Sequence, residues 1–100
     1  MAFTYRISTE AQNDITEAYN WYEKEQSNLG DEFLKSLDTA KDAIIDNPRV
    51  FSFRYQSKVR GYLLERFPFI VLYIINDQFI DVISVFHTSQ NPQKYEERVV

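Results

Sequence analysis

The sequence contains no cysteine, one histidine, two glycines and three prolines among its 100 residues. Without cysteine, a disulfide framework and a thiolate metal site are both excluded. A single histidine argues against a histidine-based zinc site. The isolated glycines Gly30 and Gly61 form no motif of the kind that cradles phosphate groups. We therefore expect neither a metal nor another cofactor.

Long apolar runs are also lacking. The longest, residues 67–75, is far too short to span a bilayer as a helix. The N-terminus, Met-Ala-Phe-Thr-Tyr-Arg, shows no apolar segment of the kind found in signal peptides. We expect a cytoplasmic protein with no membrane contact, folded as one domain over residues 1–100.

The net charge of −4 argues against generic nucleic-acid binding, but the charge is unevenly distributed. Residues 1–46 hold ten acids and four bases (−6), whereas residues 47–100 hold five acids and seven bases (+2). The second half includes a basic group between residues 49 and 66, with Glu65 as the one acid among them: Arg49, Arg54, Lys58, Arg60 and Arg66. On a strand, Lys58, Arg60 and Arg66 would share a face, since their numbers differ by even steps. The simplest interpretation is a solvated surface that balances acidic helices. The alternative, which we test as a hypothesis, is contact with an anionic partner, mainly through Arg60 and Arg66.

Hydrophobic periodicity predicts the elements. It indicates a strand at residues 3–7, a helix from about 9 to 25, and a second helix from about 31 to 46 that ends at Asn47-Pro48. Strands follow at residues 59–66, 69–75 and 79–86, with a further short one near 51–55. We predict an α+β fold: an N-terminal strand, an antiparallel helical hairpin, and a mainly antiparallel sheet of three to four strands.

The predicted strand at residues 69–75 is apolar on both faces. Two helices can cover one face of a small sheet. The second face, with Ile70 and Leu72, must be covered by the C-terminal tail, by a second copy of the chain, or by a partner. We favour a partner or a homodimer over the tail, and we therefore expect Ile70 and Leu72 to contact it.

Several other residues have mainly structural interpretations. Trp21 and Tyr22 are expected to pack the helices, one ring facing the sheet and the other lying at the hairpin edge. Asp14 and Asn47 are interpreted as groups that cap helices or tie loops. Gly61, inside a predicted strand, indicates a bulge or a close approach of backbones.

The order of short motifs from Tyr5 to Pro92 resembles the RelE/ParE toxin superfamily. The matching motifs are Ala11-x-x-Asp14, Trp21-Tyr22, Leu29-Gly30-x-x-Phe33, Asn47-Pro48, Val59-Arg60, Phe67-Pro68-Phe69-x-Val71-x-Tyr73, Val85-Phe86-His87 and Asn91-Pro92. The Leu-Gly-x-x-Phe turn and the long helical hairpin are more similar to the ParE side. The resemblance implies a groove occupied by a cognate antitoxin, and one of two actions: ribosome-dependent mRNA cleavage, as in RelE, or poisoning of DNA gyrase, as in ParE.

The resemblance also implies where a nuclease would place its arginines: on the long apolar strand and just after the last strand. This chain has Ile70 and Gln90 there, which removes the charge that would stabilise a phosphorane. The remaining catalytic candidates are His87 as general acid, Glu65 as base, and Tyr95 near a position where relatives use tyrosine. A lone histidine at a strand end more commonly forms hydrogen bonds with a neighbouring loop.

These observations favour a ParE-like toxin that binds an antitoxin and blocks DNA gyrase or another macromolecule without catalysis. The first alternative is a RelE-like endonuclease acting on the ribosome with an altered site. The second is a protein of the same fold that has lost toxicity and acts through binding alone.

Overall fold

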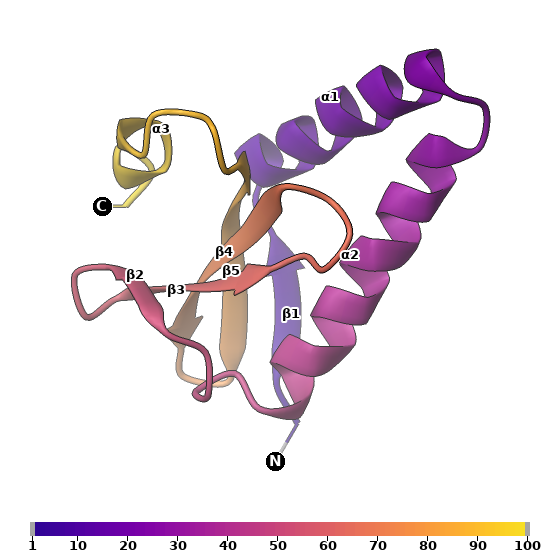
Figure 1. The fold of residues 1–100 in the computed structure, drawn as a ribbon. Coiled ribbons are helices and arrows are strands. Elements are labelled where there is room, and N and C mark those ends of the chain that lie inside the picture. Colours follow the sequence, from indigo (N-terminus) through magenta and orange to yellow (C-terminus); the bar gives the residue numbers. More distant parts are fainter. Residues whose placement is uncertain (1, 100) are drawn as a thin grey trace.

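The computed structural model describes residues 2–99, which form five strands and three helices (Figure 1). In chain order these are β1 (Thr4–Ile7), α1 (Thr9–Glu25), α2 (Leu29–Asp46), β2 (Phe53–Tyr55), β3 (Val59–Leu63), β4 (Phe69–Asn76), β5 (Phe79–His87) and α3 (Gln93–Glu96). The predicted α+β fold is confirmed, including the short strand near residues 51–55.

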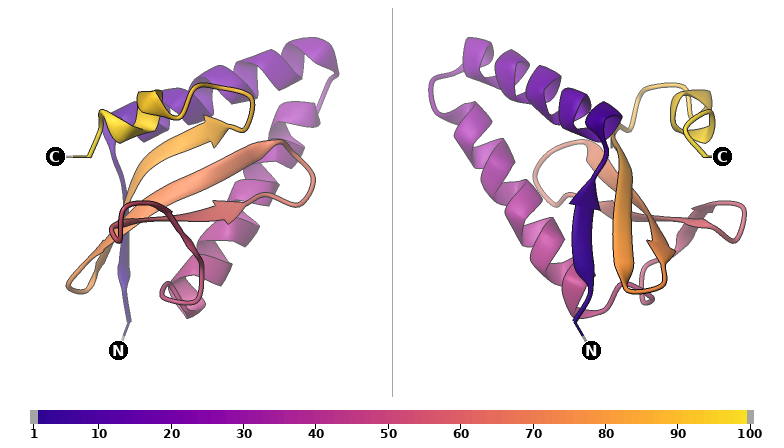
Figure 2. Two further views of the ribbon diagram at one scale, coloured as in Figure 1. Left: turned by 60° about the vertical axis from the view of Figure 1, so that its left-hand side comes forward. Right: turned by 180° about the vertical axis from the view of Figure 1, so that it is seen from behind.

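All five strands belong to one sheet, in the order β1-β5-β4-β3-β2. The pairs β2–β3, β3–β4 and β4–β5 are antiparallel, whereas β1 lies parallel to β5. The hairpin of α1 and α2 covers one face of this sheet, and α3 lies on the other side (Figure 2). The sheet is larger than predicted because β1 joins it at one edge and β2 at the other.

Local chemistry explains where the helices begin and end. The Ser8 hydroxyl accepts a hydrogen bond from the Ala11 N–H at 3.1 Å, which caps the first turn of α1. Asp31 and Glu32 place negative charge at the positive end of α2. That helix ends at Asp46 because Pro48 disfavours helical backbone at the residue before it.

The larger core lies between the helical hairpin and the sheet and is rich in aromatic rings. Tyr22 packs against Phe33 and Phe67, with ring centroids 5.4 and 4.9 Å apart. Tyr73, fully buried on β4, donates a hydrogen bond from its hydroxyl to the Pro48 carbonyl at 2.8 Å. Trp21 is 58% exposed while Tyr22 is buried, as expected for one ring facing the sheet and one at the hairpin edge.

A smaller core occupies the second face of the sheet, and the C-terminal tail covers it. Tyr95 of α3 packs on Phe86 with ring centroids 5.0 Å apart, in a cluster with Ile70 and Leu72. Our preference for a second chain over the tail is therefore wrong for this face. Ile70 and Leu72 are 6% and 0% exposed, so a partner could contact them only by displacing α3.

Gly61 on β3 marks the close approach expected from its position in a strand. A Cβ atom at this residue would lie 2.6 Å from the Ile70 Cδ1 atom and 2.8 Å from the Arg54 Cγ atom. We predicted that this strand runs to residue 66. Strand β3 instead ends at Leu63, because the chain turns before Phe69. Within residues 2–99, no helix is both long and apolar enough to cross a membrane.

Candidate functional site

Arg60, on β3, holds together the connection between α2 and β2. Its Nη1 atom donates to the carbonyl oxygens of Arg49 and Phe51, at 3.0 and 2.8 Å. Its guanidinium carbon also lies 4.0 Å from the centre of the Phe53 ring, a cation–π arrangement. These contacts tie β3 to the α2–β2 connection and to β2, so Arg60 has a structural role whatever else it contacts.

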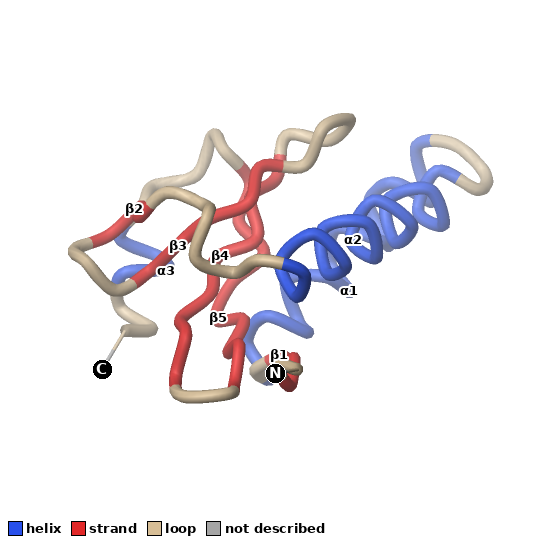
Figure 3. The backbone as a smooth tube through the Cα atoms, turned by 90° about the horizontal axis from the view of Figure 1, so that it is seen from below, coloured by secondary structure: helices blue, strands red, loops and turns tan. Residues whose placement is uncertain are grey.

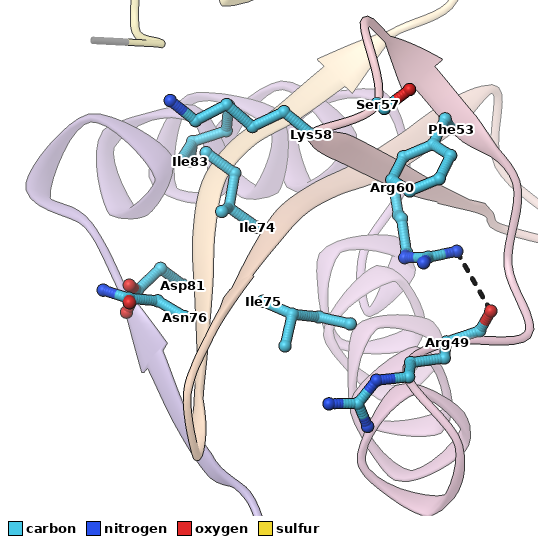
Figure 4. Close-up of a pocket in the computed structure, with 10 residues that line it drawn as sticks. All are labelled: Arg49, Phe53, Ser57, Lys58, Arg60, Ile74, Ile75, Asn76, Asp81 and Ile83. Atoms are coloured by element: carbon cyan, nitrogen blue, oxygen red, sulfur yellow. Dashed lines mark hydrogen bonds between the residues drawn. The ribbon is translucent and has the colours of Figure 1, made fainter.

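The connection forms one wall of an open cavity of about 680 Å³ (Figure 4). Three basic residues line it, together with apolar, polar and acidic side chains: Arg49, Lys58, Arg60, Phe53, Ile74, Ile75, Ile83, Ser57, Asn76 and Asp81. The only acid of this lining, Asp81, is paired with Arg6 through hydrogen bonds of 2.6 and 3.0 Å. The cavity is therefore cationic, with an apolar floor and an exposed ring, Phe53 (45% exposed). We call it the cationic cavity.

The structure divides the predicted basic group among three places. Lys58 and Arg60 line the cationic cavity. Arg66 lies beyond the end of β3 and forms an ion pair with Glu32 of α2, which lowers the pKa of that carboxyl group. Arg54 lines a different hollow, together with Tyr95. The prediction that Lys58, Arg60 and Arg66 share one strand face is wrong, because the alternation of side chains stops where the strand stops.

The His87 ring is held by its own turn. Its Nδ1 atom accepts a hydrogen bond from the Ser89 N–H at 3.1 Å and lies 2.7 Å from the Ser89 hydroxyl oxygen. The ring also packs edge-on against Phe69, 5.0 Å between centroids. Because Nδ1 accepts from a backbone N–H, the neutral ring carries its proton on Nε2. This is the loop-binding role that we gave as the commoner one for a lone histidine.

The three candidate catalytic residues lie in different surroundings. Glu65 lines a hollow beside α2 with Lys35 and Arg66. Tyr95 lies on the opposite side of the sheet, where burial raises the pKa of its hydroxyl group. No hydrogen bond among the described residues joins His87, Glu65 and Tyr95 to one another. Residues 2–99 also hold no group of three histidine, aspartate or glutamate side chains placed to bind a metal ion.

Gln90, at the second position where the resemblance implies an arginine, supports the same turn. Its side-chain oxygen accepts a hydrogen bond from the His87 N–H at 3.2 Å. Ile70, at the first such position, is buried. Neither residue presents a positive charge to a substrate.

Sequence reasoning counted Arg49 in the basic group but did not name it as a partner-binding residue. It missed Phe53 as part of the cationic cavity and Arg98 as the residue that fastens the tail. Arg98 forms a two-pronged ion pair with Asp14, with N–O distances of 2.6 and 3.1 Å. Asp14 also accepts from the Val85 N–H at 3.1 Å, which agrees with its interpretation as a tying group. The basic charge of Arg49 was visible in the sequence, but nothing there indicated which residues face it.

Comparisons with known proteins agree with this architecture. Residues 5–92 match the family model described as the ParE toxin of the type II toxin–antitoxin system parDE. The fold is similar to a chromosomal ParDE toxin–antitoxin system from P. aeruginosa, with a TM-score of 0.76 and 14% identity over 87% of this chain and 97% of the other. It is also similar to a free double arginine-to-alanine mutant of the E. coli toxin RelE, with a TM-score of 0.64 and 17% identity over 100% of both chains. A comparison with curated proteins finds no match.

Proposed function

Because the chain belongs to the family of ParE toxins of type II toxin–antitoxin systems, we propose that it binds a cognate antitoxin and inhibits DNA gyrase or another macromolecular target without catalysis. Its place of action would be the cytoplasm, where such a target is found. The antitoxin would hold the toxin inactive by occupying surface that the target needs.

The observation that carries this proposal is the cationic cavity. Arg49, Lys58 and Arg60 surround an apolar floor, and the single acid of the lining is already paired. An acidic segment with an apolar anchor would complement this surface in both charge and shape, with Phe53 as the exposed aromatic contact. The lack of a positive charge at Ile70 and Gln90 supports binding over RNA cleavage, since cutting a phosphodiester requires stabilisation of the negative charge on the phosphorane.

The proposal is tested by expressing the chain in cells with and without the protein encoded beside it. We expect growth arrest that the neighbouring protein relieves, and loss of supercoiling by purified gyrase. Toeprinting on translating ribosomes separates the alternatives, because codon-specific mRNA cleavage that disappears in His87→Ala would establish the nuclease instead. Normal growth with intact binding of the neighbour would identify the non-toxic binding protein.

The contribution of the cationic cavity is tested with Arg49→Ala and Lys58→Ala. We expect each to weaken antitoxin binding, chiefly by slowing association and flattening its dependence on salt, because exposed charges act mainly on encounter. Arg66→Ala is the matched control, since Arg66 lies on a different part of the surface and pairs with Glu32. Arg60→Ala is a poorer test, because it also removes two hydrogen bonds to the loop. If Arg49→Ala, Lys58→Ala and Arg66→Ala weakened antitoxin binding equally, only the net charge of the protein would matter and the cavity would have no special role.

A further inference from the structure

A small cavity lies beside the C-terminal tail, on the face of the sheet that the tail covers. Seen from below, α3 and the helical hairpin lie on opposite sides of the sheet (Figure 3). Next to α3 an open space of about 290 Å³ remains, which we call the tail cavity. Its wall is mainly apolar and is formed by the sheet and the tail: Leu63, Ile70, Leu72, Phe86, Pro92 and Tyr95. The tail therefore covers the second core without filling the space beside it.

One part of this apolar wall is open to water. Leu63, at the end of β3, is 53% exposed, whereas Ile70, Leu72 and Phe86 of the same wall are 6% exposed or less. A ligand that covered Leu63 would remove from water an apolar side chain that the folded chain leaves half uncovered. Such burial is favourable in proportion to the apolar area that it removes from water. The tail cavity therefore favours a ligand with an apolar part.

Among the residues that the structure describes, Arg54 is the one charged side chain in this lining. Its stem runs beside the apolar wall, since a Cβ atom on Gly61 would lie 2.8 Å from the Arg54 Cγ atom and 2.6 Å from the Ile70 Cδ1 atom. Its guanidinium group takes part in none of the ion pairs formed within residues 2–99. Glu96 follows Tyr95 on α3 but does not line the cavity. The tail cavity thus combines an apolar wall with a single positive charge.

This combination matches one class of ligand better than others. A nucleic-acid strand fits poorly, because it carries one negative charge per nucleotide and the lining holds a single base. Ile70, where the resemblance implies a nuclease arginine, is part of the apolar wall. A cation would meet the like charge of Arg54. A molecule with one negative charge and an apolar body agrees with both features of the cavity.

We propose that the tail cavity binds a small carboxylic acid with an apolar chain or ring. The apolar part lies against Leu63 and Ile70, and the carboxylate accepts hydrogen bonds from the Arg54 guanidinium group. Liquid water takes about 30 Å³ per molecule and a methylene group is of similar size, so the volume suits an acid of about six to ten carbon atoms. Tyr95 is part of the wall, so the tail stays in place when the ligand is bound.

This inference goes beyond the proposed function, since it needs neither an antitoxin nor a toxin target. The tail cavity and the cationic cavity share no lining residue. A chain without toxicity, or without a cognate antitoxin, would still bind the acid. Conversely, a tail cavity that bound no acid would leave the proposed function unchanged, so the failure of one is distinguishable from the failure of the other.

The test titrates the full chain with heptanoate, heptanol and heptylammonium, which share one apolar chain and differ in charge. Nuclear magnetic resonance follows the methyl signals of Leu63, Ile70 and Leu72. We expect saturable shifts at about millimolar heptanoate, about threefold weaker binding of heptanol, and the weakest binding for heptylammonium. Amide exchange at residues 93–96 should stay unchanged, because α3 remains docked.

Three results would overturn the proposal. They are the absence of saturable shifts at these methyl groups, equal binding of the three compounds, and faster amide exchange at residues 93–96 on binding. Tighter binding of a short peptide that ends in leucine than of heptanoate would also contradict it, because the occupant would then be the C-terminus of a protein.

Paired variants locate the contact. Arg54→Gln should weaken heptanoate binding about threefold and leave heptanol binding unchanged, because only the carboxylate meets the guanidinium group. Leu63→Gln should weaken both about fivefold through lost apolar contact. The controls are Arg49→Gln, in the cationic cavity, and Val50→Gln, at a 65% exposed apolar residue outside both linings. If Arg49→Gln weakened heptanoate binding as much as Arg54→Gln, the acid would bind elsewhere and the assignment would be wrong.

Discussion

The two faces of the sheet are covered in very different ways. One lies under two long helices, α1 and α2, and its core includes Tyr22, Phe33 and Phe67 in mutual contact. The other lies under α3, which spans only Gln93–Glu96 and contributes one buried ring, Tyr95. The helical hairpin packs on the sheet through a large core, whereas α3 packs on it through one ring. Removing a core side chain under the hairpin should therefore mainly lower stability, and removing Tyr95 should mainly release α3.

The largest expected effect is on the helix-covered face. Phe33→Ala removes a fully buried ring that packs against Phe67 and Phe69. We expect the free energy of unfolding to fall by about 3–5 kcal/mol, because the cavity left behind cannot collapse between two helices and a sheet. Urea unfolding followed by circular dichroism measures this. Leu34→Ala, at an exposed neighbouring position, is the control and should change stability far less.

Tyr95→Ala tests the tail-covered face. The ring packs on Phe86 and Tyr55, and its hydroxyl donates to the Arg54 carbonyl at 3.4 Å. We expect a loss of about 2 kcal/mol together with release of α3. Release should appear as faster proteolysis of the tail and as binding of a hydrophobic dye to the exposed face. If Tyr95→Ala proved as costly as Phe33→Ala, the two faces would not differ as we infer.

High pH should act mainly through the helix-covered face. Burial raises the pKa of Tyr73 to about 12, and it raises the pKa of Tyr5 as well. Each phenol must be neutral in the folded state, so its contribution is complete below the ordinary pKa of about 10 and is lost as pH rises from there through the folded value. At pH 11 we expect a loss of about 1 kcal/mol from Tyr73. Urea unfolding of the wild type and Tyr73→Phe between pH 9 and 11 measures it, and parallel curves would contradict the assignment.

The smallest effect concerns two ion pairs. Asp14→Asn breaks the partly buried pair with Arg98 that fastens the tail, and should cost about 1 kcal/mol. Glu32→Gln breaks the exposed pair with Arg66 and should cost less, because water and salt screen it. The melting temperatures of the wild type and both variants, measured at low and at high salt, compare the two ion pairs. The prediction fails if high salt removes the difference between Asp14→Asn and wild type.

Much of this architecture could be predicted from periodicity. The spacing of Ala11, Ile15, Ala18 and Tyr22 defines the buried side of α1, and the change from a helical to a strand period after Pro48 separates the hairpin from the sheet. The end of β3 could not be predicted, because residues 64–66 continue a strand-like pattern while the chain turns. Because the predicted strand ran to residue 66, it placed Arg66 on the same face as Lys58 and Arg60, and the structure separates them.

The sequence by itself determined the α+β order of elements, the absence of cysteine chemistry, and the apolar character of β4 on both faces, because these depend on residue types and short-range spacing. Only the tertiary structure decided that the tail covers the second face, that Asp14 meets Arg98 across 84 residues of chain, and that the basic group is divided. Contacts between residues distant in sequence depend on how the sheet twists and where each strand ends. No local pattern carries that information.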